Sequence, residues 1–145
     1  MVKSDELKDL KIRESVDIVL IPTVGEVRAG FSMYAQNNII GYQKVDSDQI
    51  NRNKTYFFLK VVGDSMNLCI REGDTVLVEH TPSVESGDIV IAMLDDDEAV
   101  IKRTKFHKDS LSLIPESTNP IHKVQIYNPD KVKIIGKVIK SERYF

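Results

Sequence analysis

The chain of 145 residues has little cysteine and no long apolar run. Cys69 is its only cysteine, which excludes a disulfide framework within the chain and fits a reducing compartment. No stretch approaches the roughly 18 consecutive apolar residues of a membrane span, and the charged residues 1–16 lack the apolar core of a signal peptide. These absences favour a soluble, cytoplasmic protein.

An excess of charge of one sign is also missing. The chain carries 20 basic and 22 acidic residues, a net charge of −2, so it has no global electrostatic reason to bind nucleic acid or an anionic membrane. If DNA is involved, another segment must supply the contact. With 41% hydrophobic residues the chain can bury one sizeable core, and a single globular domain is its simplest organisation.

The residues that most often hold metals or act as bases are few and scattered. His80 lies at a predicted strand end, and His107 and His122 lie in polar loop segments, so all three are interpreted as ordinary solvated residues. Together with Cys69 and the acidic run at 95–98, they do not show metal-ligand spacing. The sequence therefore predicts no metal or other cofactor, and it weakens a Ser-His-Asp or metallohydrolase interpretation.

The organisation of the chain changes once, near residue 18. Residues 1–17 are charged, contain no Gly or Pro and have only scattered apolar residues, so we interpret them as a hinge or linker. Residues 18–145 are expected to form one domain, in which short β-branched and aromatic runs alternate with turn residues. The expected strands are 18–21, 56–62, 75–78, 88–93, 99–103, 111–114 and 132–139. This pattern predicts a compact, mostly β fold.

One serine and one lysine are the candidates for chemistry. Ser65 follows Gly63-Asp64 at the exit of a predicted strand, where it is either a polar turn residue or an exposed nucleophile. Lys102 shares a strand face with Val100, so its ammonium either reaches solvent or is desolvated. A desolvated lysine has a depressed pKa and can act as the base for a serine hydroxyl. Neither residue alone decides between a structural and a catalytic role.

Three segments in order carry a family resemblance: GDSM with Ser65, REGDTVLVE, and GDIVIAMLDDDEAVIKR with Lys102. Residues from about 21 to 145 resemble the self-cleaving LexA-type repressors, the UmuD mutagenesis proteins and related phage repressors. The resemblance implies the LexA/signal-peptidase-like compact β fold, with a flexible linker and a cleavage-site loop. It also implies that Ser65 is the nucleophile and Lys102 its base. The backbone N–H groups of Asp64 and Ser65 would then form the oxyanion hole.

The resemblance also implies a substrate within the same chain. IPTVGEVRAGF resembles the cleavage-site region, so Ala29-Gly30 is the expected scissile bond, with Val27 and Arg28 just before it in the recognised loop. Ala fits a small pocket, and Gly lets the chain approach a buried nucleophile without a side-chain clash. Taken alone, VRAGF is a strand-to-turn junction.

The family further implies partners and a context. It implies a homodimer formed by the C-terminal strand in VKIIGKVIKSERYF, and co-activation by a RecA filament on single-stranded DNA. An N-terminal helix-turn-helix domain, through which operator DNA would be bound, is not found in this chain. We therefore expect the self-cleaving domain of a LexA-like repressor of the SOS response to DNA damage.

Other classes remain open at this stage. A UmuD-like translesion-synthesis accessory protein and a phage repressor are alternatives within the same family. A signal-peptidase-like enzyme would use the same chemistry on other chains, but the absent membrane anchor and the internal Ala-Gly pair argue against it. An inactive dimerisation module would have the same fold but no peptidase activity.

Overall fold

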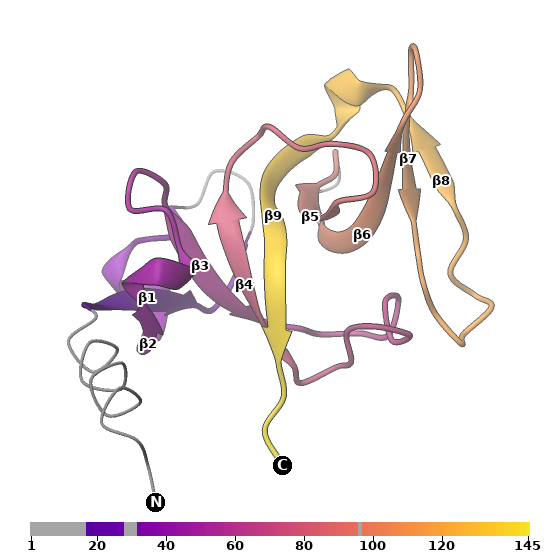
Figure 1. Cartoon of the computed structure of the whole chain (residues 1–145). Coiled ribbons are helices and arrows are strands. Elements are labelled where there is room, and N and C mark those ends of the chain that lie inside the picture. Colours follow the sequence, from indigo (N-terminus) through magenta and orange to yellow (C-terminus); the bar gives the residue numbers. More distant parts are fainter. Residues whose placement is uncertain (1–16, 28–31, 96) are drawn as a thin grey trace, which may run out of the picture.

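A computed structural model describes residues 17–27, 32–95 and 97–145 as one mixed sheet with three short 3-10 turns. The strands are β1 (Ile18–Val24), β2 (Ile39–Asp46), β3 (Tyr56–Lys60), β4 (Thr75–His80), β5 (Ile89–Met93), β6 (Ala99–Phe106), β7 (Leu111–Ile114), β8 (Gln125–Tyr127) and β9 (Lys133–Glu142). Their order in the sheet is β2-β1-β3-β4-β9-β5-β6-β7-β8 (Figure 1). The turns are η1 (Gln36–Asn38), η2 (Ser47–Gln49) and η3 (Pro129–Lys131). The expected mostly β fold is confirmed.

Strand β9 joins the two halves of the sheet. It pairs antiparallel with β4 on one edge and with β5 on the other, and Figure 1 shows it running between them. Within it, Gly136 lies so close to β4 that an added Cβ would be 2.5 Å from the carbonyl oxygen of Glu79 and 2.6 Å from Cγ1 of Val78. Only glycine allows this approach without a shift of the backbone.

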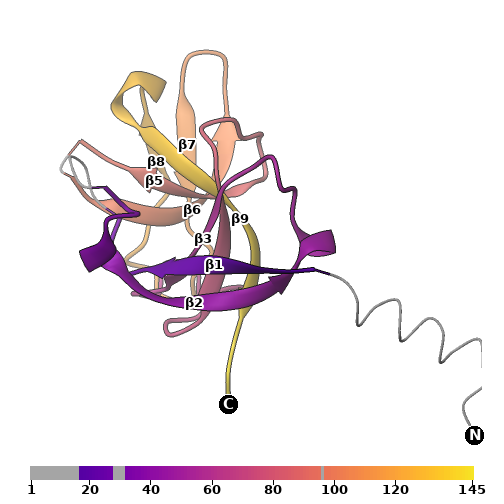
Figure 2. The ribbon, with the colours of Figure 1, turned by 90° about the vertical axis from the view of Figure 1, so that its left-hand side faces the viewer.

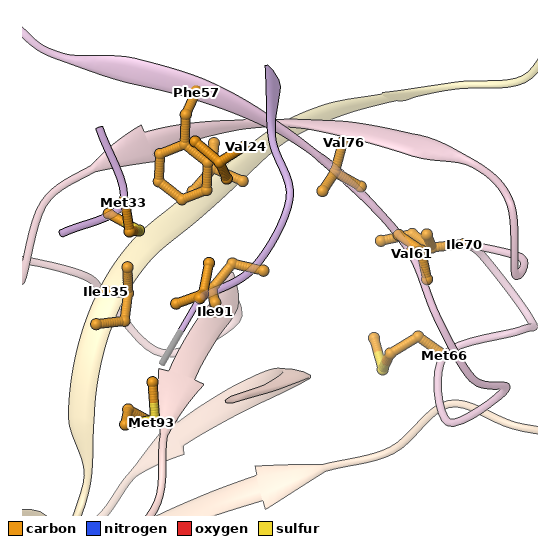
Figure 3. Packing of buried hydrophobic residues seen from close by; sticks show 12 residues of the cluster. Val24, Met33, Phe57, Val61, Met66, Ile70, Val76, Ile91, Met93 and Ile135 are labelled. Atoms are coloured by element: carbon orange, nitrogen blue, oxygen red, sulfur yellow. The ribbon is translucent and has the colours of Figure 1, made fainter. Parts of the chain in front are cut away.

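The main hydrophobic core contains residues from both halves of the sheet. Successive side chains of a strand point to opposite faces, so neighbouring residues of one strand belong to different clusters. Phe57 of β3, Ile91 of β5 and Ile135 of β9 belong to this one cluster (Figure 3). The neighbouring residues Phe58 and Val90 belong to two other clusters on the opposite faces. Each fully buried side chain of this size contributes about 1.5–3 kcal/mol to stability.

The first two strands form a ribbon at one end of the sheet. Figure 2 shows β1 and β2 side by side, and their register runs from Ile18 opposite Asp46 to Val24 opposite Ile39. Strand β1 also pairs in parallel with β3, which is the only parallel contact in the described sheet. This pairing brings the residues that follow β1 next to those that follow β3.

All seven expected strand runs coincide with or overlap observed strands, but two strands were missed. Strand β2 lies at the sheet edge, with exposed positions alternating along most of its length, and β8 has three residues at the other edge. Edge strands need no continuous apolar run, so composition did not mark them. The linker assigned to residues 1–17 stays a prediction, since residues 1–16 lie outside the described part.

No helix within the described ranges combines the length and the apolar character needed to cross a bilayer.

The contact at Gly136 predicts a strong effect of a small substitution. Gly136→Ala should lower the free energy of unfolding by about 1–3 kcal/mol, because its Cβ would overlap the β4 backbone and force the strands apart. Urea denaturation followed by circular dichroism measures this change. The matched control is Gly41→Ala in β2, where nothing lies within 4 Å of the added Cβ. Equal stability of both variants would contradict the tight β4–β9 contact.

Candidate active site

The turn that carries Ser65 belongs to a loop at residues 61–74 whose base is closed by hydrogen bonds. The amide of Val61 donates to the carbonyl of Asp74 at 2.8 Å, and the amide of Gly73 donates to the carbonyl of Val61 at 2.9 Å. Arg143, just beyond β9, donates to both carboxylate oxygens of Asp74 at 2.7 and 2.8 Å. This guanidinium holds the pKa of the Asp74 carboxyl below its usual value. The loop is therefore fixed to the end of β9.

Within the loop, Met66 anchors the turn to the core. Its side chain is only 2% exposed and belongs to the main cluster, where Figure 3 shows it together with Val61 and Ile70. The amide of Ile70 donates to the carbonyl of Met66 at 2.7 Å, and Gly63 has a φ of 89°, which glycine adopts most easily. Ser65 is thus held in place by a neighbour that cannot move without opening the core.

A second segment, between β7 and β8, is hydrogen-bonded to this turn. The amide of Glu116 donates to the carbonyl of Ser65 at 2.9 Å, and the amide of Leu68 donates to the carbonyl of Glu116 at 3.0 Å. The Glu116 carboxylate also accepts two hydrogen bonds from Arg103 of β6, both at 2.9 Å. The turn with Ser65 is therefore linked to the half of the sheet that contains Lys102.

Asp64 is bonded to three residues of the same segment. Its carbonyl accepts from Ser117 Oγ at 2.7 Å, and its carboxylate accepts from Asn119 Nδ2 at 3.1 Å and interacts with His122 Nε2 at 2.5 Å. The hydrogen bonds from His122 and Asn119 lower the pKa of the Asp64 carboxyl. The segment from Ser117 to His122 therefore sets both the position and the charge of the residue before Ser65.

All three histidines have specific side-chain partners. His80 and His107 are exposed, as expected, whereas His122 is partly buried, so its interpretation as an ordinary solvated residue is wrong. His122 binds Asp64, His80 Nδ1 lies 2.8 Å from the hydroxyl of Tyr34, and His107 Nε2 lies 2.9 Å from Ser112 Oγ. Each partner except that of His107 is far away in the sequence, which gave no local signal. Among the described residues, no group of three or more His, Cys, Asp or Glu is placed to hold a metal.

A cavity of about 530 Å³ brings the candidate residues together. Ser65 and Lys102 both line it, and Glu98, His122 and residues 25–27 complete much of its wall. The Ser65 hydroxyl makes a long contact of 3.5 Å with the carbonyl oxygen of Ile101, the residue before Lys102. Among the described residues its hydroxyl has no hydrogen bond to Lys102, so direct contact between the two side chains stays a prediction.

Lys102 is half-buried, which favours the desolvated of the two states that its strand face left open. Val100 packs against the cluster on the outer face of β5 and β7, and Ile101 packs against the main core, which follows the alternation along β6. Burial lowers the pKa of Lys102, while the negative charges of Glu98 and Asp64 oppose this shift. A lysine with a lowered pKa holds more of the neutral form that can accept a proton.

The other predicted site residues are only partly described. The amide of Ser65 donates to no carbonyl within the described ranges, whereas the Asp64 amide interacts with its own carboxylate. Val27 is 9% exposed and lies on the cavity wall. Arg28 and the pair Ala29-Gly30 fall outside the described residues.

The fold and cavity belong to a known class of peptidase-like domains. A sequence profile of the Peptidase S24-like family matches residues 22–139, and the chain belongs to this family. It is similar to the LexA repressor of Oleidesulfovibrio alaskensis, with 38% identity over 130 residues, which cover 89% of this chain and 61% of that protein. The LexA repressor of Pelagibacter ubique is 36% identical over 126 residues, covering 86% of this chain and 55% of that protein. The chain thus spans little more than half the length of these relatives.

The charges around Lys102 predict the effect of one isosteric substitution. Asp64→Asn should lower the pKa of Lys102 further, because it removes a nearby negative charge that favours the ammonium form. A pH titration of the Lys102 side chain by NMR measures this shift. Glu72→Gln is the control, since that carboxylate contacts the same loop at the amide of Gly63 but is not among the charges acting on Lys102. An unchanged or raised Lys102 pKa in Asp64→Asn would count against this electrostatic arrangement.

Proposed function

We propose that this chain is the self-cleaving serine peptidase and dimerisation part of a LexA-like repressor of the DNA-damage response in the cytoplasm. Ser65 acts as nucleophile, Lys102 as base, and the Ala29-Gly30 bond is the substrate. The observation that carries the proposal is that Ser65, Lys102 and residues 25–27 line a single cavity. The similarity to two LexA repressors favours the repressor over the UmuD-like and phage-repressor alternatives.

The position of Val27 supports cleavage within the same chain. Val27 is buried on the cavity wall, and Ala29 is two residues further along the sequence. An extended chain covers at most about 3.3–3.6 Å per residue, so the Ala29 carbonyl lies within about 7–8 Å of the Val27 backbone. The scissile bond can therefore enter the cavity while β1 keeps its place in the sheet.

The chemistry follows from the groups in the cavity. Neutral Lys102 takes the proton of the Ser65 hydroxyl as Oγ attacks the Ala29 carbonyl carbon, and the backbone amide of Ser65, with that of Asp64, stabilises the oxyanion. The ammonium of Lys102 then protonates the amine of Gly30 as the peptide bond breaks. Water hydrolyses the resulting ester between Ser65 and Ala29, which regenerates the hydroxyl.

The state of Lys102 explains why such a reaction needs a trigger. An unperturbed lysine is neutral in only about four molecules in ten thousand at pH 7. Entry of the cleavage segment into the cavity would remove more water from Lys102 and lower its pKa further. A RecA filament on single-stranded DNA that favours the docked segment would then accelerate cleavage by population shift. Operator DNA would be bound by a helix-turn-helix domain of a longer protein.

The dyad predicts two inactive variants with an intact fold. Wild-type protein at alkaline pH should cut itself with first-order kinetics independent of concentration, and mass spectrometry should place the cut between Ala29 and Gly30. Ser65→Ala and Lys102→Ala should each reduce the rate at least about a thousandfold, because each removes a group that takes part in bond cleavage. Lys105→Ala, on the exposed end of β6, should cleave like wild type. A Lys102→Ala variant as fast as wild type would eliminate the assignment of the base.

The fold restricts how the expected dimer can form. The expected strand at 132–139 cannot pair along its whole length, because residues 133–137 of β9 already lie against β5 and residues 136–142 against β4. Residues 138–142 have no partner strand on the β5 side within the described sheet. Ile139, Tyr144 and Phe145 are exposed in the same region. We therefore place the proposed two-fold contact at residues 138–145.

A charge placed at this edge should separate the dimer. Wild-type protein should be mostly dimeric at micromolar concentration, and Ile139→Lys should raise the dissociation constant at least about tenfold by placing two ammonium groups at the contact. Sedimentation velocity over a concentration series measures both. Ile126→Lys changes an exposed isoleucine of the other sheet edge, β8, and should leave the dimer intact. A wild-type protein that is monomeric at these concentrations would refute the proposed contact.

A further inference from the structure

Asn38 is a buried polar residue whose hydrogen bonds are all committed to its own hairpin. It is the last residue of the 3-10 turn η1 and is only 4% exposed. Its Oδ1 accepts from the amide of Glu26 at 3.0 Å, and its Nδ2 donates to the carbonyls of Glu26 and Met33, both at 2.9 Å. Its backbone carbonyl accepts from the amide of Gly25 at 2.8 Å. Every donor and acceptor of the side-chain amide thus contacts backbone.

These bonds join the two ends of the segment that contains Ala29-Gly30. Glu26 lies on the outgoing side, two residues after β1, and Met33 lies on the returning side, before η1. Gly25 permits the close approach, because a Cβ at that position would be 3.3 Å from Oδ1 of Asn38. One side chain therefore fixes the spacing between the two ends of residues 27–32.

The outgoing end is also part of the cavity wall. Gly25, Glu26 and Val27 line the cavity with Ser65 and Lys102, and Val27 and Met33 are both buried in the main core. The bonds of Asn38 therefore hold Glu26, at the described end of the cleavage segment, on the wall of the cavity that Ser65 lines. An asparagine amide suits this role because it offers one acceptor and two donors in one plane.

We propose that Asn38 is a positioning residue for self-cleavage, which ties both ends of the segment around Ala29-Gly30 beside the cavity. The inference rests on the proposed function, since it concerns the substrate of that same reaction. Asn38 touches neither the nucleophile nor the base. It raises the rate by holding Glu26 and Met33, the described ends of the segment, at a fixed spacing, which lowers the entropic cost of bringing the scissile bond to Ser65.

Two assays on the full chain separate positioning from catalysis. The first measures self-cleavage at alkaline pH. The second measures cleavage in trans of a synthetic peptide with the sequence of residues 22–35, in a background where Gly30→Pro prevents cleavage of the chain's own bond. Asn38→Ala should slow self-cleavage at least about tenfold, because buried hydrogen bonds that restrain the segment are lost. In the peptide assay, the chain with both Asn38→Ala and Gly30→Pro should cleave the peptide at least as fast as the chain with Gly30→Pro alone, because a loosened segment competes less for the cavity.

Two further variants make the test specific. Asn38→Asp keeps the shape and one acceptor but removes both donors and places a negative charge near two carbonyls, so it should also slow self-cleavage. Asn37→Ala is the matched control, because Asn37 is exposed in the same turn, and it should stay within about twofold of wild type. Peptide cleavage by an Asn38 variant also reports that its site is folded.

The outcomes are distinguishable. Wild-type rates of self-cleavage in both Asn38 variants would overturn the inference and leave the proposed function intact. Equal losses in self-cleavage and peptide cleavage would also overturn it, because Asn38 would then support the site rather than the substrate. Absence of self-cleavage in the wild-type sequence, together with absence of peptide cleavage in the Gly30→Pro background, would refute the proposed function itself.

Discussion

The pairing of β9 with both β4 and β5 is the contact on which the rest of the structure depends. Without it the β1–β4 half and the β5–β8 half would share no hydrogen-bonded edge in the described sheet. The candidate site lies across this division, since Ser65 follows β3 and Lys102 belongs to β6. The close approach at Gly136 fixes β9 near its middle, and the Arg143–Asp74 pair fixes the chain just beyond its end. The geometry of the cavity therefore depends on the pairing of β9 with β4 and β5.

Polar contacts between distant segments then refine the positions of the reactive groups. Asp64 accepts hydrogen bonds from residues more than 50 positions away, which hold the turn before Ser65 against the β7–β8 connection. The same carboxylate opposes the fall in the pKa of Lys102 that burial causes. Asp64 thus holds the turn in place and also makes the neutral form of Lys102 less favourable. The balance between burial and nearby carboxylates sets how much neutral lysine the cavity contains.

Much of the framework could be predicted from local patterns, and the details of the site could not. The β-branched runs identified β4, β7 and the centre of β9, and the shared face of Val100 and Lys102 indicated partial burial of the lysine. The edge strands β2 and β8 lack continuous apolar runs and were missed. His122 and Asn38 were missed because an ordinary polar loop residue and a buried hydrogen-bonding residue look alike in sequence. Their roles depend on partners that only the tertiary fold brings close.

The dependence of the site on β9 has a consequence for the timing of synthesis. Residues 29–30 and Ser65 leave the ribosome long before residues 133–142, so a nascent chain carries the proposed cleavage segment and the serine before the strand that joins the two halves. Until β9 has emerged and inserted between β4 and β5, no strand pairing joins the half of the sheet that contains Lys102 to the half that the Ser65 turn follows. For the proposed self-cleavage, the order of the strands along the chain thus delays assembly of the complete site until the last strand has been made.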